Sequence, residues 1–174
     1  MKSLCIRGLI ALGALLVLGA VNVSIVGKER IERDGDVVYL ALAPVDPRSL
    51  MQGDYMALRF ALADELAREL ERGDEKAGTP RREGETRFAR IALDAQRVAR
   101  LASIETRDAP GTPAPMRLRY RIRNGQVWLG TNAFFFEEGT AERFTSARYG
   151  EFRVDRASGE AVLVGLRDQA LQAL

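Results

Sequence analysis

The chain has 174 residues and carries 26 Lys and Arg side chains against 24 Asp and Glu side chains. It has no histidine and one cysteine, Cys5, so an internal disulfide, an imidazole base and a His or Cys metal site are excluded. No basic stripe with interleaved aromatic residues occurs, which makes nucleic-acid binding a poor interpretation. We expect neither a cofactor nor a nucleic-acid partner.

The N-terminal segment is predicted to be a membrane anchor. Residues 8–27 form a run of 20 residues without a charge, preceded by Lys2 and Arg7. At about 1.5 Å per helical residue this run spans about 30 Å, the thickness of a bilayer's hydrocarbon core. Neither residues 18–20 nor residues 22–24 offer a suitable small residue three positions before a cut, so we favour an uncleaved anchor over a cleaved signal peptide. A buried helix of a soluble protein is the remaining alternative.

The orientation of this anchor is predicted from its flanks. Three basic residues follow the span closely and two precede it, which on a simple count favours the reverse topology. A long domain is translocated regardless of such charges, and a tail of seven residues stays inside easily, so we expect residues 28–174 outside the cytoplasm. All 24 acidic residues and 24 of the 26 basic ones lie in this part, which is therefore neutral overall.

We divide the chain into a cytoplasmic tip with the anchor (residues 1–27), a charged stalk (28–36) and one domain (37–174). About 140 residues suit a single domain with its own core. The first strand is predicted over residues 37–42, which are apolar on both faces and belong inside a sheet.

Two turns are predicted between the first strand and the second. Pro47 fixes its own backbone and pushes Asp46 towards an extended conformation. Gly53 can take a positive φ, and Asp54 can accept hydrogen bonds from nearby amides. The second strand is predicted over residues 55–62 and is expected to pair with the first. Its core-facing side chains alternate with outward ones; they are Met56, Leu58, Phe60 and Leu62.

A short helix is predicted over residues 63–72, because Leu62, Leu66 and Leu70 recur every four residues and a glycine follows. Residues 73–84 are rich in glycine and charge, and we expect a mobile surface loop there.

The rest of the chain alternates as strands do. Further strands are predicted over residues 86–94, 97–106, 116–123, 126–129, 151–155 and 161–166. Asn124-Gly125 is the strongest turn signal and predicts a two-residue type I′ hairpin. Short helical segments are expected from residue 140 to near residues 149–150 and over residues 168–174. The predicted fold is mainly β (α+β): one small, mostly antiparallel domain with one or two short helices behind a transmembrane helix.

Two later stretches have unusual compositions. Residues 116–123 place apolar side chains on one face and four arginines on the other. Residues 134–139 run from three phenylalanines into two glutamates. We expect core packing from this aromatic patch, with Phe135 either in a second contact layer or on an exposed partner surface.

Gly53, Asp54, Tyr55, Leu58 and Phe60 resemble the GDYXXLXY motif that names a family of bacterial membrane-anchored proteins. Phe60 departs from the motif's final Tyr, keeping the ring and losing the hydroxyl. Residues 44–48 and 136–139 also resemble the family's pattern. The resemblance implies a bacterial inner-membrane protein with a multi-spanning membrane protein as companion, and it labels a family without an assigned activity.

The candidate binding residues flank the predicted turns and the acidic end of the aromatic patch. They are Asp46, Arg48, Gly53, Asp54, Tyr55, Glu138 and Gly139. Ordered loops held by rigid elements are where recognition is usually placed. The plain alternative is that both aspartates cap turns and Arg48 pairs with one of them. If Glu137 and Glu138 fold back towards Arg48 or Arg143, a charged pocket forms beside the phenylalanines.

An enzyme is the second hypothesis. Asp54 with Glu137 could act as paired acid and base, and Ser49 with Lys76 could form a dyad. Lys76 falls in the predicted mobile loop, where its amine is not desolvated enough to serve as a base. A calcium site from Asp46, Asp54 and Glu138 lacks a known ligand spacing. We therefore predict no catalytic and no metal residues, and a membrane-anchored binding or accessory module rather than an envelope hydrolase.

Overall fold

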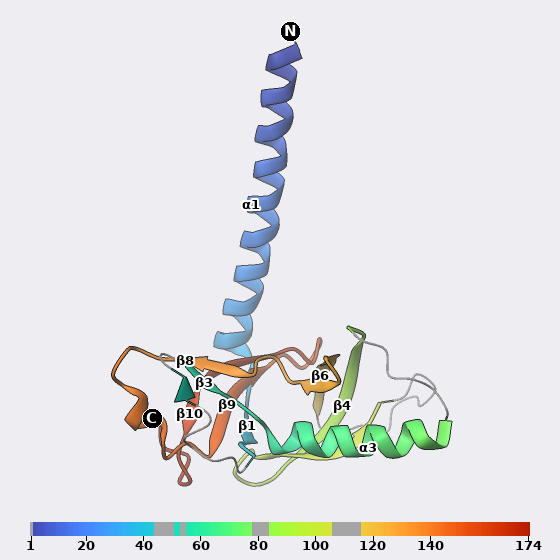
Figure 1. The fold of residues 1–174 in the computed structure, drawn as a ribbon, viewed down its shortest axis with the longest axis vertical. Coiled ribbons are helices and arrows are strands. Elements are labelled where there is room, and N and C mark those ends of the chain that lie inside the picture. Colours follow the sequence, from blue (N-terminus) through green and yellow to red (C-terminus); the bar gives the residue numbers. More distant parts are fainter. Residues whose placement is uncertain (1, 44–50, 53–54, 78–83, 106–115) are drawn as a thin grey trace.

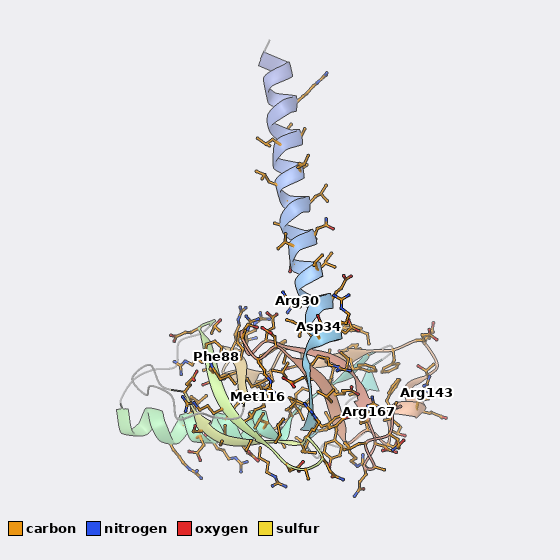
Figure 2. The ribbon with its side chains drawn as sticks, turned by 180° about the vertical axis from the view of Figure 1, so that it is seen from behind. Arg30, Asp34, Phe88, Met116, Arg143 and Arg167 are labelled. Atoms are coloured by element: carbon orange, nitrogen blue, oxygen red, sulfur yellow. The ribbon has the colours of Figure 1, made fainter. Side chains whose placement is uncertain are left out.

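The computed structural model describes residues 2–43, 51–52, 55–77, 84–105 and 116–174. A long helix, α1 (Lys2–Asp34), rises like a rod from a β-rich domain, with the N-terminus at its far end (Figure 1). Its segment Ile10–Asp34 is long and apolar enough to cross a membrane. The side chains drawn along it project into open space on all sides (Figure 2). An apolar helical segment exposed in this way is suited to the hydrocarbon core of a bilayer.

The predicted stalk is not a separate segment. The helix continues through most of it to Asp34 and ends at Gly35, whose amide donates to the carbonyl of Ile31 at 2.9 Å. The next residue already belongs to β1 (Asp36–Ala41), so the anchor passes into the domain without a linker.

The first sheet has the order β1-β9-β10, and both pairings are antiparallel. Its later strands are β9 (Tyr149–Val154) and β10 (Ala161–Arg167), which confirms the predicted final hairpin. The expected pairing of the first strand with the second is reduced to one bridge among the described residues, between Leu42 and Phe60. On one side β1 pairs with β9 along its length, and on the other Tyr39 bridges Val98.

The second sheet is the largest, with the order β5-β4-β6-β7. Its strands are β4 (Thr86–Leu93), β5 (Ala99–Ile104), β6 (Met116–Arg123) and β7 (Gln126–Trp128). All four were predicted within a few residues. Asn124 has φ 50° and Gly125 has φ 72°, so the β6–β7 connection has two positive φ angles, as a type I′ turn requires.

The third sheet carries the motif and has the order β2-β3-β8. Its strands are β2 (Met51–Gln52), β3 (Tyr55–Ala57) and β8 (Ala133–Phe135). The strand predicted over residues 55–62 therefore ends at Ala57. The predicted alternation of burial nevertheless continues past that end, since Met56, Leu58 and Phe60 are buried while Ala57 and Arg59 are exposed.

Helix α3 (Ala61–Ala77) lies on the side of the domain away from α1 (Figure 1). It packs against β1, β5 and β7, and its buried side chains are the predicted Leu62, Leu66 and Leu70. The expected end before Gly73 was wrong. An exposed glycine costs a helix only about 1 kcal/mol, too little to stop one flanked by good helix formers. Lys76 consequently belongs to this helix and not to a loop.

The buried side chains of all three sheets and α3 form one core, with Phe60, Tyr120 and Phe152 among its largest members. The helix expected from residue 140 to near residues 149–150 is shorter than predicted: it forms a 3-10 turn, η1 (Ala141–Phe144), and Tyr149 already belongs to β9. The helical turn expected over residues 168–174 was wrong. The Asp168 carboxylate accepts the amides of Ala170 and Gln172 at 2.8 and 2.9 Å, and this local bonding competes with helix formation.

Candidate functional site

The pairing of β3 with β8 brings the motif strand against the aromatic patch. Its antiparallel register sets Tyr55 opposite Phe135 and Met56 opposite Phe134. Because side chains alternate along strands, one pair faces the core and the other faces outward. The rings of Tyr55 and Phe135 lie 5.8 Å apart between centroids, inclined by 40°. We call this outward pair the aromatic corner.

The three phenylalanines divide between core and surface. Phe134 and Phe136 pack on the buried Phe144, with ring centroids 5.1 and 5.2 Å apart. Phe135 is 75% exposed and is the single large exposed hydrophobic residue outside α1 in the described part of the chain. Of the two placements weighed for Phe135, the structure shows the exposed surface.

Glu138 and Gly139 lie in a tight turn just beyond β8. The Glu137 carbonyl accepts the Thr140 amide at 3.1 Å and the Thr140 hydroxyl at 2.6 Å, which closes the turn. Gly139 has φ +80°, a conformation that side chains with a Cβ rarely adopt. Both predicted residues are exposed, and β3–β8 pairing places this turn at the end of the strand beside Tyr55.

The other predicted binding residues cannot be placed in this way. Asp46, Arg48, Gly53 and Asp54 lie outside the described residues. The fold-back of the glutamates onto Arg143, considered above as the condition for a charged pocket, is not present in the described residues: the Arg143 guanidinium lies 5.8 Å from the Phe144 ring centroid and pairs with no carboxylate there.

The hydrolase alternative also depends on residues that lie outside the described part of the chain. Ser49 and Asp54 are outside the described residues, and Lys76 lies in the last turn of α3. Within the described ranges, no three His, Cys, Asp or Glu side chains gather closely enough to hold a metal ion.

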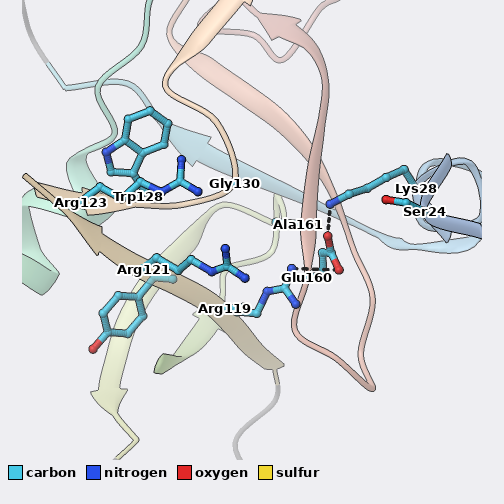
Figure 3. Close-up of a pocket in the computed structure, with 10 residues that line it drawn as sticks. Ser24, Lys28, Arg119, Arg121, Arg123, Trp128, Gly130, Glu160 and Ala161 are labelled. Atoms are coloured by element: carbon cyan, nitrogen blue, oxygen red, sulfur yellow. Dashed lines mark hydrogen bonds and ion pairs between the residues drawn. The ribbon is translucent and has the colours of Figure 1, made fainter. Parts of the chain in front are cut away.

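A second feature, which the sequence did not predict, is a cleft of about 390 Å³ between the lower end of α1 and the edge of the domain (Figure 3). Its basic side chains come from α1 and from the outward face of β6. We call it the cationic cleft; its lining side chains include Lys28, Arg119, Arg121, Arg123, Trp128 and Glu160. The four arginines of residues 116–123 were visible in the sequence, but nothing there showed that α1 lies beside them.

Glu160 closes one side of the cleft. Its carboxylate accepts Lys28 from α1 and Arg119 from β6, the latter at 2.9 Å, as the dashed lines in Figure 3 show. Burial, and then the nearby Arg121, lower the pKa of the Arg119 guanidinium from its ordinary value. The carboxylate therefore links the anchor to the domain within a crowded group of cations.

The other two arginines are bound more loosely. Arg121 donates to the Thr86 hydroxyl at 3.3 Å, and the Arg123 guanidinium lies 5.1 Å from the Trp128 ring centroid. Among the described residues neither arginine pairs with a carboxylate, and both are exposed. Guanidinium groups in this state are available to an anion from outside.

The fold and its two surface features define a small β-rich domain carried on one apolar helix that could span a membrane. The family model described as "GDYXXLXY protein" matches residues 17–166, so the chain belongs to the GDYXXLXY family. No curated protein and no solved structure matches the chain significantly.

Proposed function

We propose that the protein is a single-pass binding module of the bacterial inner membrane, which presents its aromatic corner outside the cytoplasm to a membrane-embedded protein partner. In this proposal α1 is the anchor, and the domain is an accessory subunit without catalytic activity of its own. The partner supplies an apolar surface close to the bilayer, into which Phe135 fits.

The exposed Phe135 is the observation that carries this proposal. Burying a phenylalanine side chain contributes about 1.5–3 kcal/mol relative to leaving it in water, so a partner that covers this ring would gain binding free energy of that order. Aromatic side chains of this kind are enriched where protein partners meet.

The strand that carries Phe135 supports the same conclusion. In the described part of the chain β8 pairs only with β3, so it is an edge strand with one unpaired side. Soluble domains usually protect such edges against pairing with other chains. A short edge strand with an exposed aromatic residue is suited to a contact that a partner completes.

The position of β8 supports a partner in the same membrane. Figure 1 shows β8 along the side of the domain from which α1 rises. The helix also contacts β9 and β10 and enters β1 without a linker, so the aromatic corner keeps its distance from the anchor. A partner that reaches it must have a surface near the end of α1.

Site-specific photocrosslinking in native membranes tests the proposal. A photoreactive amino acid is introduced at Phe135 in the full chain, and after irradiation the adduct is identified by mass spectrometry. We expect one discrete adduct with an integral membrane protein.

The matched control is a probe at Arg68, an exposed residue of α3 on the side of the domain away from α1. We expect no adduct from this position. Obtaining the same products from both positions, or no product from Phe135, would contradict the proposed partner surface.

A further inference from the structure

The cationic cleft lies at a particular depth if α1 is the membrane anchor proposed above, on which this inference rests. Lys28 is the first charged residue after the uncharged run of residues 8–27. When that run fills the hydrocarbon core, Lys28 lies at the level of the lipid headgroups. Lys28 lines the cleft at this level, and Ser24 lines it about 6 Å further towards the hydrocarbon core, one helical turn deeper.

The charge inside the cleft is unbalanced. Lys28, Arg119, Arg121 and Arg123 face the single carboxylate of Glu160, which already accepts two of them. Alternate residues of one strand face are only about 6.6 Å apart along the strand, so the three arginines of β6 repel one another. An anion placed among them would relieve this repulsion and bind to donors that the protein has already arranged.

The chemistry of the lining favours a phosphate group. Planar guanidinium groups bind phosphate oxygens through two parallel hydrogen bonds. Trp128 lies beside Arg123, and tryptophan is enriched at the level of lipid headgroups, where its ring and its N–H group meet different environments. The volume of about 390 Å³ admits a headgroup, and the charged lining does not suit an acyl chain.

We propose that the cationic cleft binds the phosphate headgroup of an anionic phospholipid, with Arg121 and Arg123 as the principal ligands. Bound lipid would sit between α1 and β6 and hold the domain in a fixed orientation against the bilayer surface. The site is distinct from the aromatic corner, because it is formed by α1, β6, β7 and the start of β10.

Lipid retention by the full chain tests this proposal. The protein is reconstituted into nanodiscs of phosphatidylcholine with phosphatidylglycerol as the anionic probe, and the lipids that remain bound after mild delipidation are counted by native mass spectrometry. We expect wild type to retain phosphatidylglycerol preferentially. The R121Q/R123Q variant is expected to lose this preference roughly tenfold or more, because each basic side chain contributes separately to binding an anionic surface.

Two further variants distinguish lipid binding in the cleft from a general effect of positive charge and from loss of the fold. R68Q/R100Q removes the same charge from exposed positions on α3 and β5, and it should retain phosphatidylglycerol like wild type. R121K/R123K keeps the charge without the planar fork and should fall between wild type and R121Q/R123Q. Equal retention by wild type and R121Q/R123Q, or an equal loss in R68Q/R100Q, would overturn the proposal.

Trp128 distinguishes a lipid from free phosphate, because it is the only tryptophan in the chain. We expect its emission to change when phosphatidylglycerol is added to the disc, and not when inorganic phosphate or glycerol phosphate is added to discs of phosphatidylcholine alone. A response to the soluble phosphates alone would overturn the lipid assignment. A chain that leaves the disc would overturn the anchor itself, whereas a chain that stays without lipid preference overturns only this inference.

Discussion

At the scale of single residues, Gly35 decides how the anchor meets the domain. A Cβ atom there would lie 2.4 Å from the Ile31 carbonyl oxygen and 3.1 Å from the Arg153 Cβ. The first of these contacts is with backbone, which cannot move aside as a flexible side chain can. Glycine is therefore required where α1 ends and β1 begins.

Gly35→Ala should destabilise the folded domain by about 1–3 kcal/mol, the usual cost of forcing extra atoms into a packed site. Gly73→Ala is the matched control, because nothing lies within 4 Å of its ideal Cβ and it is in the interior of α3. This control should stabilise the protein by about 0.5–1 kcal/mol. Thermal or chemical unfolding measures both, and changes of the same sign would contradict the account of Gly35.

Substitutions of Phe135 and Phe144 are expected to have opposite effects on stability and on partner binding. Phe135→Ser should leave the unfolding free energy nearly unchanged, since the side chain is mostly exposed, and should abolish crosslinking from a probe placed at Tyr55. Phe144→Ala should lower the unfolding free energy by about 3–5 kcal/mol, because its buried ring packs on Phe134 and Phe136. A large loss of stability in Phe135→Ser would show that the ring serves the fold.

At the scale of elements, the start of β1 is held by charge. The Asp36 carboxylate accepts the Arg156 guanidinium and that of Arg97, the latter at 3.4 Å. Arg97 also donates to the Val37 carbonyl at 2.7 Å. Hydrogen bonding from Arg156, and then the charges of both arginines, hold the pKa of Asp36 below its ordinary value of 3.8. These bonds connect the end of the anchor with the β4–β5 and β9–β10 turns.

The lowered pKa of Asp36 predicts a loss of stability in acid. Its contribution is complete above the ordinary value of 3.8 and declines as the pH falls through the lower pKa of the folded state. The stability gap between wild type and Asp36→Asn should therefore stay constant at neutral pH and shrink as the pH falls below 3.8. The pKa of Asp155 is also lowered, mainly by the Ser158 hydroxyl. Because wild type and Asp36→Asn both keep Asp155, its contribution cancels in the difference between them. A gap that is independent of pH would contradict the prediction.

At the scale of the whole molecule, the continuous path from α1 into β1 fixes both surface features relative to the anchor. The aromatic corner and the cationic cleft are built from segments that are distant in sequence, and both depend on where the domain lies beside the helix. Lys28 adds a direct link, because it reaches across to Glu160.

Inserting a flexible Gly-Ser segment between Asp34 and Gly35 should leave the fold of the domain intact while releasing its fixed orientation relative to α1. The three sheets and their core do not include residues before Asp36, so the domain should still unfold cooperatively. Crosslinking from Phe135 and retention of phosphatidylglycerol should both fall several-fold, because the orientation of the domain is no longer fixed. Undiminished crosslinking and lipid retention would show that the rigid junction does not matter for either contact.

Local features of the sequence determined much of this protein. The uncharged run predicted the apolar part of α1, and Asn124-Gly125 predicted the hairpin. Alternation predicted the burial of Met56, Leu58 and Phe60 and all the strands except β2 and β8, because these features depend on neighbours along the chain. Gly73 was a weak signal for a helix end, and α3 continues through it to Ala77.

Only the tertiary structure decided which segments meet. β1 pairs with β9 and not with β3, β8 lies beside the motif strand, and α1 lies beside the arginines of β6. Alternation assigns a residue to a face, but it does not say which strand or helix lies next to that face. The choice depends on how the whole core packs, and so the aromatic corner was visible in the sequence as separate residues while the cationic cleft was not visible at all.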